Sequence, residues 1–119
     1  MNIGKKGEEI ASAYLVKRGF KIVERNFSKK VGELDIIAIK DKEFYFVEVK
    51  TSLDKVDKEN RPEERVDHYK LKRISRAIQI YTLRKNLEGK NWRFLVIPIL
   101  LNPESGTARI KIIEDVVPE

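Results

Sequence analysis

Three carboxylates and one lysine are the residues of this chain whose types and spacing could do chemistry: Glu33, Asp35, Glu48 and Lys50. Carboxylate oxygens are the ligands that hard divalent cations such as magnesium prefer. Two carboxylates that hold a cation against a phosphate oxygen lower the pKa of a bound water and stabilise the transition state. A lysine beside the scissile phosphate can position that water or neutralise developing charge. The residue types therefore indicate metal-dependent phosphodiester hydrolysis.

A predicted β-hairpin brings these four residues together. Residues 32–40 and 43–50 have the composition of two strands, and only two residues separate them. A two-residue turn places Lys40 opposite Glu43 and so fixes the register. Because side chains alternate between the two faces of a strand, all four charged residues lie on one face of the hairpin. The register predicts two cross-strand pairs: Asp35 with Glu48, and Glu33 with Lys50.

The predicted cluster is unfavourable unless something binds it. The rest of both strand faces is apolar, which is typical of strands buried in a sheet. Like charges directly opposite one another destabilise a ladder, and burying them costs more unless they are paired. A divalent cation would resolve this conflict. The alternative is a structural ion-pair network among Asp35, Glu48 and Lys50.

The remainder of the chain predicts a single α/β domain over residues 1–119. Apolar residues recur at helical spacing in two segments, and shorter apolar runs mark the strands. We expect the first three strands to form a meander, the second helix to cross over one face of the sheet, and the first helix to cover the other face. The expected elements are helix 3–18, strands 20–27, 32–40 and 43–50, helix 62–87, and strands 92–101 and 108–113.

Capping and breaking residues set the expected boundaries. Asn2 can cap the first helix. A charged loop over residues 51–61 leads to Pro62, which suits the first position of the second helix. We expect that helix to stop before Gly89. Pro98 predicts an edge or a bend in the fourth strand.

Two charged side chains lie beside the apolar faces of the predicted helices. Glu8 falls at the edge of the apolar arc of the first helix. Lys70 falls in the middle of the apolar stripe of the second helix, which consists of Val66, Ile74, Ala77, Ile78 and Tyr81. By itself, a glutamate at a helix edge is usually solvated, and Lys70 could extend its ammonium group to water.

The composition favours an anionic partner and excludes several classes of site. The net charge is +6 and the pI is about 9.5, which is compatible with nucleic-acid binding. Lys29 and Lys30, in the turn that leads to Asp35, are candidates for phosphate contact. The absence of cysteine excludes disulfides, thiolate zinc sites and a cysteine nucleophile, and it fits a cytoplasmic location. No apolar run is long enough to span a bilayer, so no membrane association is expected.

The charged hairpin also resembles a known group of nucleases. Gly32-Glu-Leu-Asp35 and Phe46-Val-Glu48-Val-Lys50 resemble the PD-(D/E)xK signature of restriction-endonuclease-like nucleases. Over residues 4–97 the chain more closely resembles the YraN-like family, which is related to archaeal Holliday junction resolvases. The further matching residues are Gly4, Gly7, Glu8, Ala11, Tyr14, Leu15, Gly19, Phe20, Asn26, Val66, Lys70, Arg73, Ala77, Arg93 and Phe94.

The resemblance implies a restriction-endonuclease-like core, in which a mixed sheet lies between helices in the order α-β-β-β-α-β-β. It also implies magnesium or manganese as cofactor and DNA as substrate. Two positions depart from the family pattern, because Thr51 stands where arginine is usual and Leu95 where aspartate is usual. The implied site consists of the catalytic Lys50, the metal ligands Asp35, Glu48, Glu8 and the carbonyl of Val49, and the supporting Glu33 and Lys70.

Three functions follow from these observations. The first is a metal-dependent DNA endonuclease that acts on branched or otherwise structured DNA. The second is a nucleic-acid-binding module that keeps the fold without cutting, and the third is a structural subunit of a larger assembly. Resolving a branched junction needs two cuts, so a two-fold homodimer would suit the first function.

Overall fold

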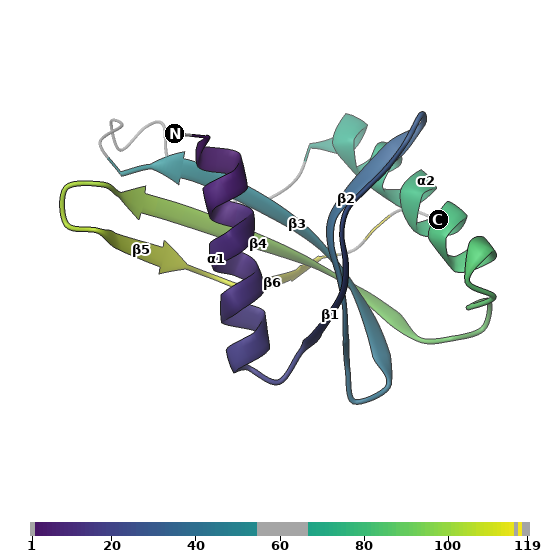
Figure 1. Cartoon of the computed structure of the whole chain (residues 1–119). Helices are drawn as coiled ribbons and strands as arrows, with labels where there is room; N and C mark the ends of the chain where they lie inside the picture. The colour runs from purple at the N-terminus through teal and green to yellow at the C-terminus, as the bar shows by residue number, and fades with distance from the viewer. Residues whose placement is uncertain (1, 55–66, 116, 118–119) are drawn as a thin grey trace.

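The computed structural model describes residues 2–54, 67–115 and 117 (Figure 1). Helices and strands follow one another in the predicted α/β order, and the last predicted strand is divided into two. The elements are α1 (Ile3–Lys17), β1 (Lys21–Lys29), β2 (Gly32–Lys40), β3 (Glu43–Leu53), α2 (His68–Arg84), β4 (Trp92–Asn102), β5 (Thr107–Ile110) and β6 (Ile113–Asp115).

One mixed sheet connects all the strands. Its order is β1-β2-β3-β4-β5, and β6 pairs with β4. β1, β2 and β3 form the predicted antiparallel meander. β4 then lies parallel to β3, which requires the chain to return across the sheet between them. The predicted mixed sheet is therefore confirmed.

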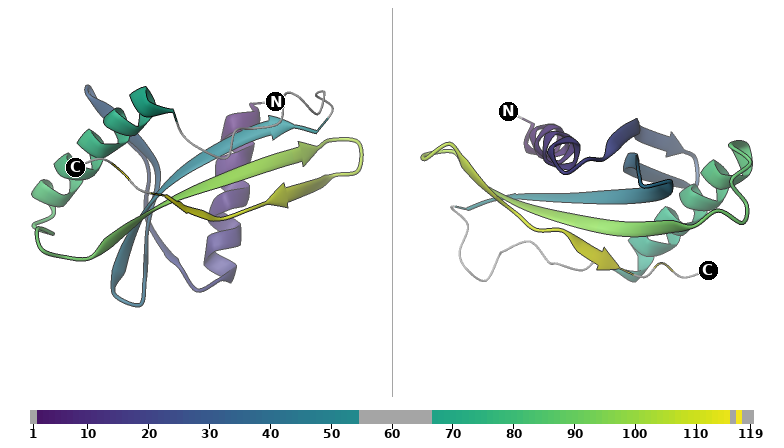
Figure 2. Two further views of the ribbon diagram at one scale, coloured as in Figure 1. Left: turned by 180° about the vertical axis from the view of Figure 1, so that it is seen from behind. Right: turned by 90° about the horizontal axis from the view of Figure 1, so that it is seen from below.

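The two helices cover opposite faces of the sheet (Figure 2). On one face, Tyr81 of α2 packs among sheet side chains that include Phe46 and Phe94. On the other face, Ala11 and Leu15 of α1 pack against a second group of apolar side chains from β2, β3 and β4. Each strand of the central hairpin is thus buried on both faces, as its apolar composition predicts. No helix in the described part of the chain is long and apolar enough to span a membrane.

The helix boundaries agree with the prediction for α1 and differ for α2. The Asn2 side chain accepts a hydrogen bond from the backbone N–H of Lys5, as expected of an N-cap. Helix α2 begins at His68, because Asp67 has an extended backbone and its carboxylate caps the helix. The predicted start at Pro62 lies outside the described residues, as does Val66, and the helix does not continue N-terminally through Asp67.

One further prediction about the second half of the sheet is wrong, and one of the two alternatives for Pro98, an edge or a bend, is excluded. Residues 51–53 continue β3 instead of starting a loop, because they pair with β4. β4 is an interior strand and not an edge, since it has β3 on one side and β5 and β6 on the other. Pro98 is tolerated because it falls between the segment of β4 that pairs with β6 and the segment that pairs with β5.

Candidate functional site

Close to its turn, the β2–β3 hairpin has the predicted register. The two strands pair antiparallel from the turn as far as Ile36 and Val47. The turn residues Asp41 and Lys42 have φ angles of 51° and 68°. A type I′ turn requires positive φ at both central residues, and its twist matches that of the flanking strands. The two-residue turn and its register are therefore confirmed in this part of the hairpin.

The regular ladder stops where the charged residues begin. Neither Asp35 with Glu48 nor Glu33 with Lys50 is a pair of the described β2–β3 ladder, so the prediction of regular pairing at this end is wrong. Instead, the first part of β2 leaves β3 and continues with β1 as an arm that bends toward α2 (Figure 1). The two strands consequently separate at Asp35, and we call this opening the fork.

The physical reason for the fork lies in β1. Asn26 has a φ angle of 55° within that strand. It stands across from Asp35, because its neighbours pair with the residues on either side of Asp35. A left-handed residue interrupts the extended backbone and increases its twist. As a result, Leu34 packs on the α2 side of the sheet while Ile36 packs on the α1 side, although strand alternation would put both on one face.

This account of the bend predicts opposite effects for two substitutions of Asn26. Asn26→Val is expected to destabilise the protein by about 1–2 kcal/mol, because a β-branched residue is strained at positive φ. Asn26→Gly should keep the bend, because glycine adopts positive φ freely. The Val49 amide should exchange its hydrogen faster only in the valine variant, since Asp35 holds that amide across the fork. Ser28→Val, on the same strand, is the control, and equal exchange in all variants would contradict the account.

Asp35 reaches across the fork to β3. Its Oδ2 atom accepts a 2.7 Å hydrogen bond from the backbone N–H of Val49. The Asp35 carboxyl group is also hydrogen-bonded to that of Glu48. Glu48 is buried, with 4% of its surface exposed. The two carboxyl groups thus meet through their side chains across an opening in the sheet, and not as neighbours in a ladder.

Glu48 holds its proton more tightly than an ordinary glutamate. Burial, the hydrogen bond to Asp35 and the negative charge of Asp35 together raise the pKa of Glu48 to about 8, although the charge of Lys70 opposes this. Burial has this direction because it disfavours the charged form of a carboxyl group. Near neutral pH, Glu48 therefore carries a proton between itself and Asp35 unless another cation replaces it.

Lys70 contacts the same carboxyl group from α2. Its Nζ atom lies 3.0 Å from Oε1 of Glu48. Burial lowers the pKa of Lys70, but the charge of Glu48, the hydrogen bond to it and the charges of Asp35 and Glu33 together outweigh burial and raise this pKa. The ammonium group is therefore directed at the carboxylates, even though 39% of the side chain is exposed.

Glu8 approaches the fork from α1, on the other side of the sheet. Burial and then the negative charge of Asp35 raise the pKa of Glu8, with a smaller contribution from Glu33, and Arg25 opposes them. Its Oε1 atom is buried and has no hydrogen-bond partner among the described residues. A hollow of about 500 Å³ between α1 and β1 lies beside it. The buried oxygen is therefore available to a ligand that enters from this side.

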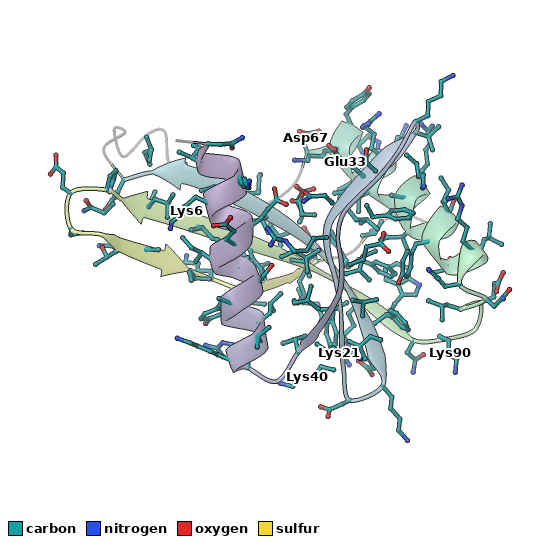
Figure 3. All side chains as sticks on the ribbon, in the orientation of Figure 1. Lys6, Lys21, Glu33, Lys40, Asp67 and Lys90 are labelled. Atoms are coloured by element: carbon teal, nitrogen blue, oxygen red, sulfur yellow. The ribbon has the colours of Figure 1, made fainter. Side chains whose placement is uncertain are left out.

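The other candidate residues are less closely grouped. Lys50 is half-buried on β3, two residues beyond Glu48. Glu33 is exposed on the arm, on the side near the start of α2 (Figure 3). Lys29 and Lys30 lie at the tip of the arm, beyond the fork.

A pair of carboxyl groups, and not a cluster of three, forms the centre of the site. Among the residues that the structure describes, no group of three or more Asp, Glu or His side chains is close enough to hold a metal ion. Asp35 and Glu48 are in contact, whereas Glu8 interacts with Asp35 only through the effect of the Asp35 charge on the pKa of Glu8. A cation that used all three side chains would require Glu8 to move closer.

Two residues of this site were assigned no role in it from the sequence alone, although Asn26 is among the residues that carry the YraN-like resemblance. Asn26 shapes the fork, and Arg25 lies close enough to Glu8 to lower its pKa. A usable signal existed for Asn26, because asparagine is depleted in strands and enriched at positive φ. No comparable signal distinguished Arg25 from the other basic residues of the chain.

Comparison with known proteins places the chain in a family. The model of "Uncharacterised protein family UPF0102" matches residues 7–99. The chain belongs to UPF0102. The matched segment of UPF0102 extends from α1 into β4, so it includes every candidate site residue from Glu8 to Lys70. The YraN-like resemblance of the sequence is therefore confirmed at the level of this family.

Relatives within UPF0102 match most of the chain. The UPF0102 protein of Caldanaerobacter subterraneus subsp. tengcongensis is 41% identical over 105 residues, which cover 88% of this chain and 84% of the relative. That of Clostridium kluyveri is 42% identical over 114 residues, covering 96% and 92%. That of Thermotoga neapolitana is 46% identical over 82 residues, covering 69% and 73%. The similarity to these relatives therefore extends over most of the chain.

The two departures from the family pattern occupy packed positions. Thr51 packs directly on Gly7 of α1, where a Cβ atom would lie 1.8 Å from the threonine Oγ1 atom. Leu95 is buried in the apolar layer beneath α1. Both residues thus hold α1 against the sheet.

Proposed function

We propose that this protein is a metal-dependent DNA endonuclease that hydrolyses phosphodiester bonds, with Asp35 and Glu48 as metal ligands. The observation that carries the proposal is the contact between these two carboxyl groups at an opening of the sheet, where Glu48 is buried and Asp35 is half-buried. A folded protein gains little stability from a buried carboxyl pair that must retain a proton. A binding role explains why the pair is there.

The available donors fit a hard divalent cation such as magnesium or manganese. Asp35 and Glu48 offer carboxylate oxygens, the Val49 carbonyl is a further candidate ligand, and Glu8 has a buried oxygen without a partner in the described part of the chain. Oxygen-only donor sets suit magnesium and manganese and not the softer metals. When bound, such a cation supplies an activated water and stabilises charge on the phosphate.

The surrounding lysines have separate roles in this proposal. Lys50 follows Glu48 at alternate spacing on β3 and neutralises charge that develops on the scissile phosphate. Lys70 contacts Glu48 directly, so it positions that carboxyl group and offsets its charge when the proton has left. Glu33, exposed beside the fork, contributes negative charge to both Lys70 and Glu8.

The order of these residues along the chain also supports a nuclease. Glu8, Asp35, Glu48 and Lys50 follow one another as in the PD-(D/E)xK signature, and a mixed sheet between helices presents them. We therefore extend the family assignment to the restriction-endonuclease-like superfamily as part of the proposal. A two-fold dimer would supply the two sites that branched DNA requires.

One observation favours a second candidate function, a nucleic-acid-binding module that does not cut. The ion pair between Lys70 and Glu48 already satisfies part of the buried charge without a cation. If the proton on Glu48 and the ammonium group of Lys70 compensate all of the negative charge of the carboxyl pair, the pair has a purely structural role. DNA binding without cleavage would then be the observable activity.

Cleavage assays on a panel of DNA structures test the proposal. Single-stranded, duplex and branched DNA would be incubated with the protein and manganese at pH 8.5, above the pKa of Glu48. We expect cleavage of at least one DNA, none in EDTA, and none by a Glu48→Gln variant purified in parallel. Binding without cleavage by the wild type would favour the second function, and equal cleavage by Glu48→Gln would indicate a contaminating nuclease.

A further inference from the structure

Helix α2 has an unusual charge composition. Its sequence from His68 to Arg84 contains five Lys and Arg residues and no Asp or Glu. Exposed helices normally mix the two signs, because opposite charges four residues apart stabilise a helix and like charges destabilise it. The basic residues of α2 are Lys70, Lys72, Arg73, Arg76 and Arg84.

Apart from Lys70, these basic side chains form no ion pair with a carboxylate in the described part of the chain. Lys70 points at Glu48, and the other four are Lys72, Arg73, Arg76 and Arg84. At 100° per residue, these four side chains fall on one flank of the helix, beside the buried face that contains Ala77. Lys72, Arg76 and Arg84 are exposed there. The helix therefore presents one-sided positive charge to the surroundings.

The arm formed by β1 and β2 adjoins the same flank. Gly32 lies so close to α2 that a Cβ atom there would be 2.0 Å from the carbonyl oxygen of Arg73. This contact brings the tip of the arm, with Lys29 and Lys30, next to the middle of the helix. Phe27 of the arm packs edge-on against Tyr81 with ring centroids 5.3 Å apart, which fixes the arm along the helix.

A hollow between the arm and the end of α2 continues the positive surface. It has a volume of about 370 Å³ and is lined by Lys29, Arg84 and Lys85 as well as by Glu24. The Nζ atom of Lys29 lies 5.2 Å from the centre of the Phe27 ring, so this lysine is held at the edge of the hollow. We call the surface formed by these basic residues the basic flank. It consists of Lys72, Arg76 and Arg84 of α2, Lys29 and Lys30 at the arm tip, and Lys85 in the hollow.

We propose that the basic flank binds the sugar-phosphate backbone of duplex DNA and directs it toward the fork. The part of this inference that directs the DNA toward the fork rests on the proposed nuclease function. Lys70 of the same helix contacts Glu48 at the fork, so DNA bound along α2 would lie beside the carboxyl pair. From Lys70 to Arg84 the helix axis rises about 21 Å, at about 1.5 Å per residue. That length corresponds to roughly six base pairs of duplex, at about 3.4 Å per base pair.

The chemistry of the basic flank fits nucleic acid better than an anionic membrane. A helix that binds at a membrane interface inserts an apolar face into the lipid beneath its basic face. The apolar face of α2 is instead buried against the sheet, where Ile74, Ile78 and Tyr81 pack. The exposed face of α2 carries its basic residues together with two large apolar side chains, Tyr69 and Leu83. These two lie near opposite ends of the helix, about 21 Å apart along its axis at about 1.5 Å per residue, so they form no continuous apolar face for insertion into lipid. The basic residues between them suit phosphates that lie along a groove or strand.

Fluorescence anisotropy with a fluorescein-labelled 20-base-pair duplex tests the inference. Measurements in EDTA over a range of salt concentrations report binding without any contribution from cleavage. The test protein is the triple variant Lys72→Gln, Arg76→Gln and Arg84→Gln. The control, Lys17→Gln, Lys21→Gln and Lys90→Gln, removes the same charge from exposed positions elsewhere. Thermal melts of both variants check that the exposed substitutions leave the fold intact.

Each phosphate contact contributes about 0.9 to the slope of log affinity against log salt. We therefore expect the slope of the α2 variant to fall by about 2 to 3, and that of the control to stay within about 0.5 of the wild type. Equal losses in both variants, an unchanged slope in the α2 variant, or absence of wild-type binding at low salt would overturn the inference. Binding to phosphatidylglycerol vesicles but not to the duplex would also overturn it.

These binding measurements, combined with the cleavage assays described above, separate this inference from the proposed function. DNA binding that depends on the basic flank, without cleavage under any metal condition, would retain the inference and reject the nuclease. Metal-dependent cleavage with a salt slope that the α2 variant leaves unchanged would retain the nuclease and reject the basic flank.

Discussion

Lys50→Ala is expected to reduce DNA cleavage by about 10²–10³-fold, the effect of removing one group that stabilises charge in a transition state. Metal binding should remain, because Lys50 supplies no ligand to a cation held by Asp35 and Glu48. DNA affinity should change little, since it is distributed over many basic contacts. Single-turnover cleavage rates, with DNA binding measured in parallel, check this expectation.

Lys21→Ala is the matched control for that variant. Lys21 is an exposed lysine at the start of β1, and it pairs with Ile39 near the turn end of β2, away from the fork at Asp35. Its removal changes the net charge as Lys50→Ala does, and it should leave the cleavage rate close to that of the wild type. If the Lys50→Ala variant cleaves DNA as fast as the wild type, Lys50 takes no part in the reaction.

Manganese is expected to raise the melting temperature of the wild type and to leave that of Asp35→Asn unchanged. A ligand at 100 times its Kd stabilises the folded state by about 2.7 kcal/mol. For a domain of this size that corresponds to a rise in Tm of roughly 10 °C. Without metal and above the Glu48 pKa of about 8, Asp35→Asn should be more stable than the wild type, because an amide can donate a hydrogen bond to the ionised Glu48 where two carboxylates would repel.

The manganese effect should also depend on pH in a defined direction. The pKa of Glu48 is about 8 in the folded protein, against an ordinary value of 4.5. The folded state therefore binds the proton more tightly, and metal-free stability should fall as pH rises from about 4.5 to about 8. Because a cation must displace that proton, stabilisation by manganese should grow over the same interval. Thermal melts between pH 5 and pH 9, with and without manganese, measure both trends.

Asp41→Asn provides the control for Asp35→Asn. It is the same chemical change at the exposed β2–β3 turn, where asparagine tolerates the observed φ of 51°. Its response to manganese should equal that of the wild type. A full response in Asp35→Asn would place the cation elsewhere in the protein.

Much of the fold could be predicted because periodic patterns and turns are local properties of a sequence. The two-residue turn at Asp41 fixed the β2–β3 register through its twist, and apolar runs identified the buried strands. Boundaries were less certain where tertiary contacts decide them. Residues 51–53 look like a loop by composition, yet they pair with β4, and Pro98 is accepted inside the sheet because two different strands share that side of β4.

The candidate site was predictable in its residue types and not in its geometry. Strand alternation identified Asp35 and Glu48 as residues of one face. It could not anticipate the left-handed conformation of Asn26, which separates the strands and sends the Asp35 carboxylate to the Val49 amide. Nor could it show that Lys70, which follows Glu48 by 22 residues in the sequence, would contact it, because that contact depends on how α2 crosses the sheet.

The position of a bound manganese ion tests the central claim most directly. Crystals of the wild type soaked with manganese at pH 8.5 would be measured for anomalous scattering. We predict one strong peak at the fork, about 2.1 Å from carboxylate oxygens of Asp35 and Glu48. A peak elsewhere with an empty fork, or no peak at manganese concentrations that raise the melting temperature, would contradict the assignment of these two residues as metal ligands.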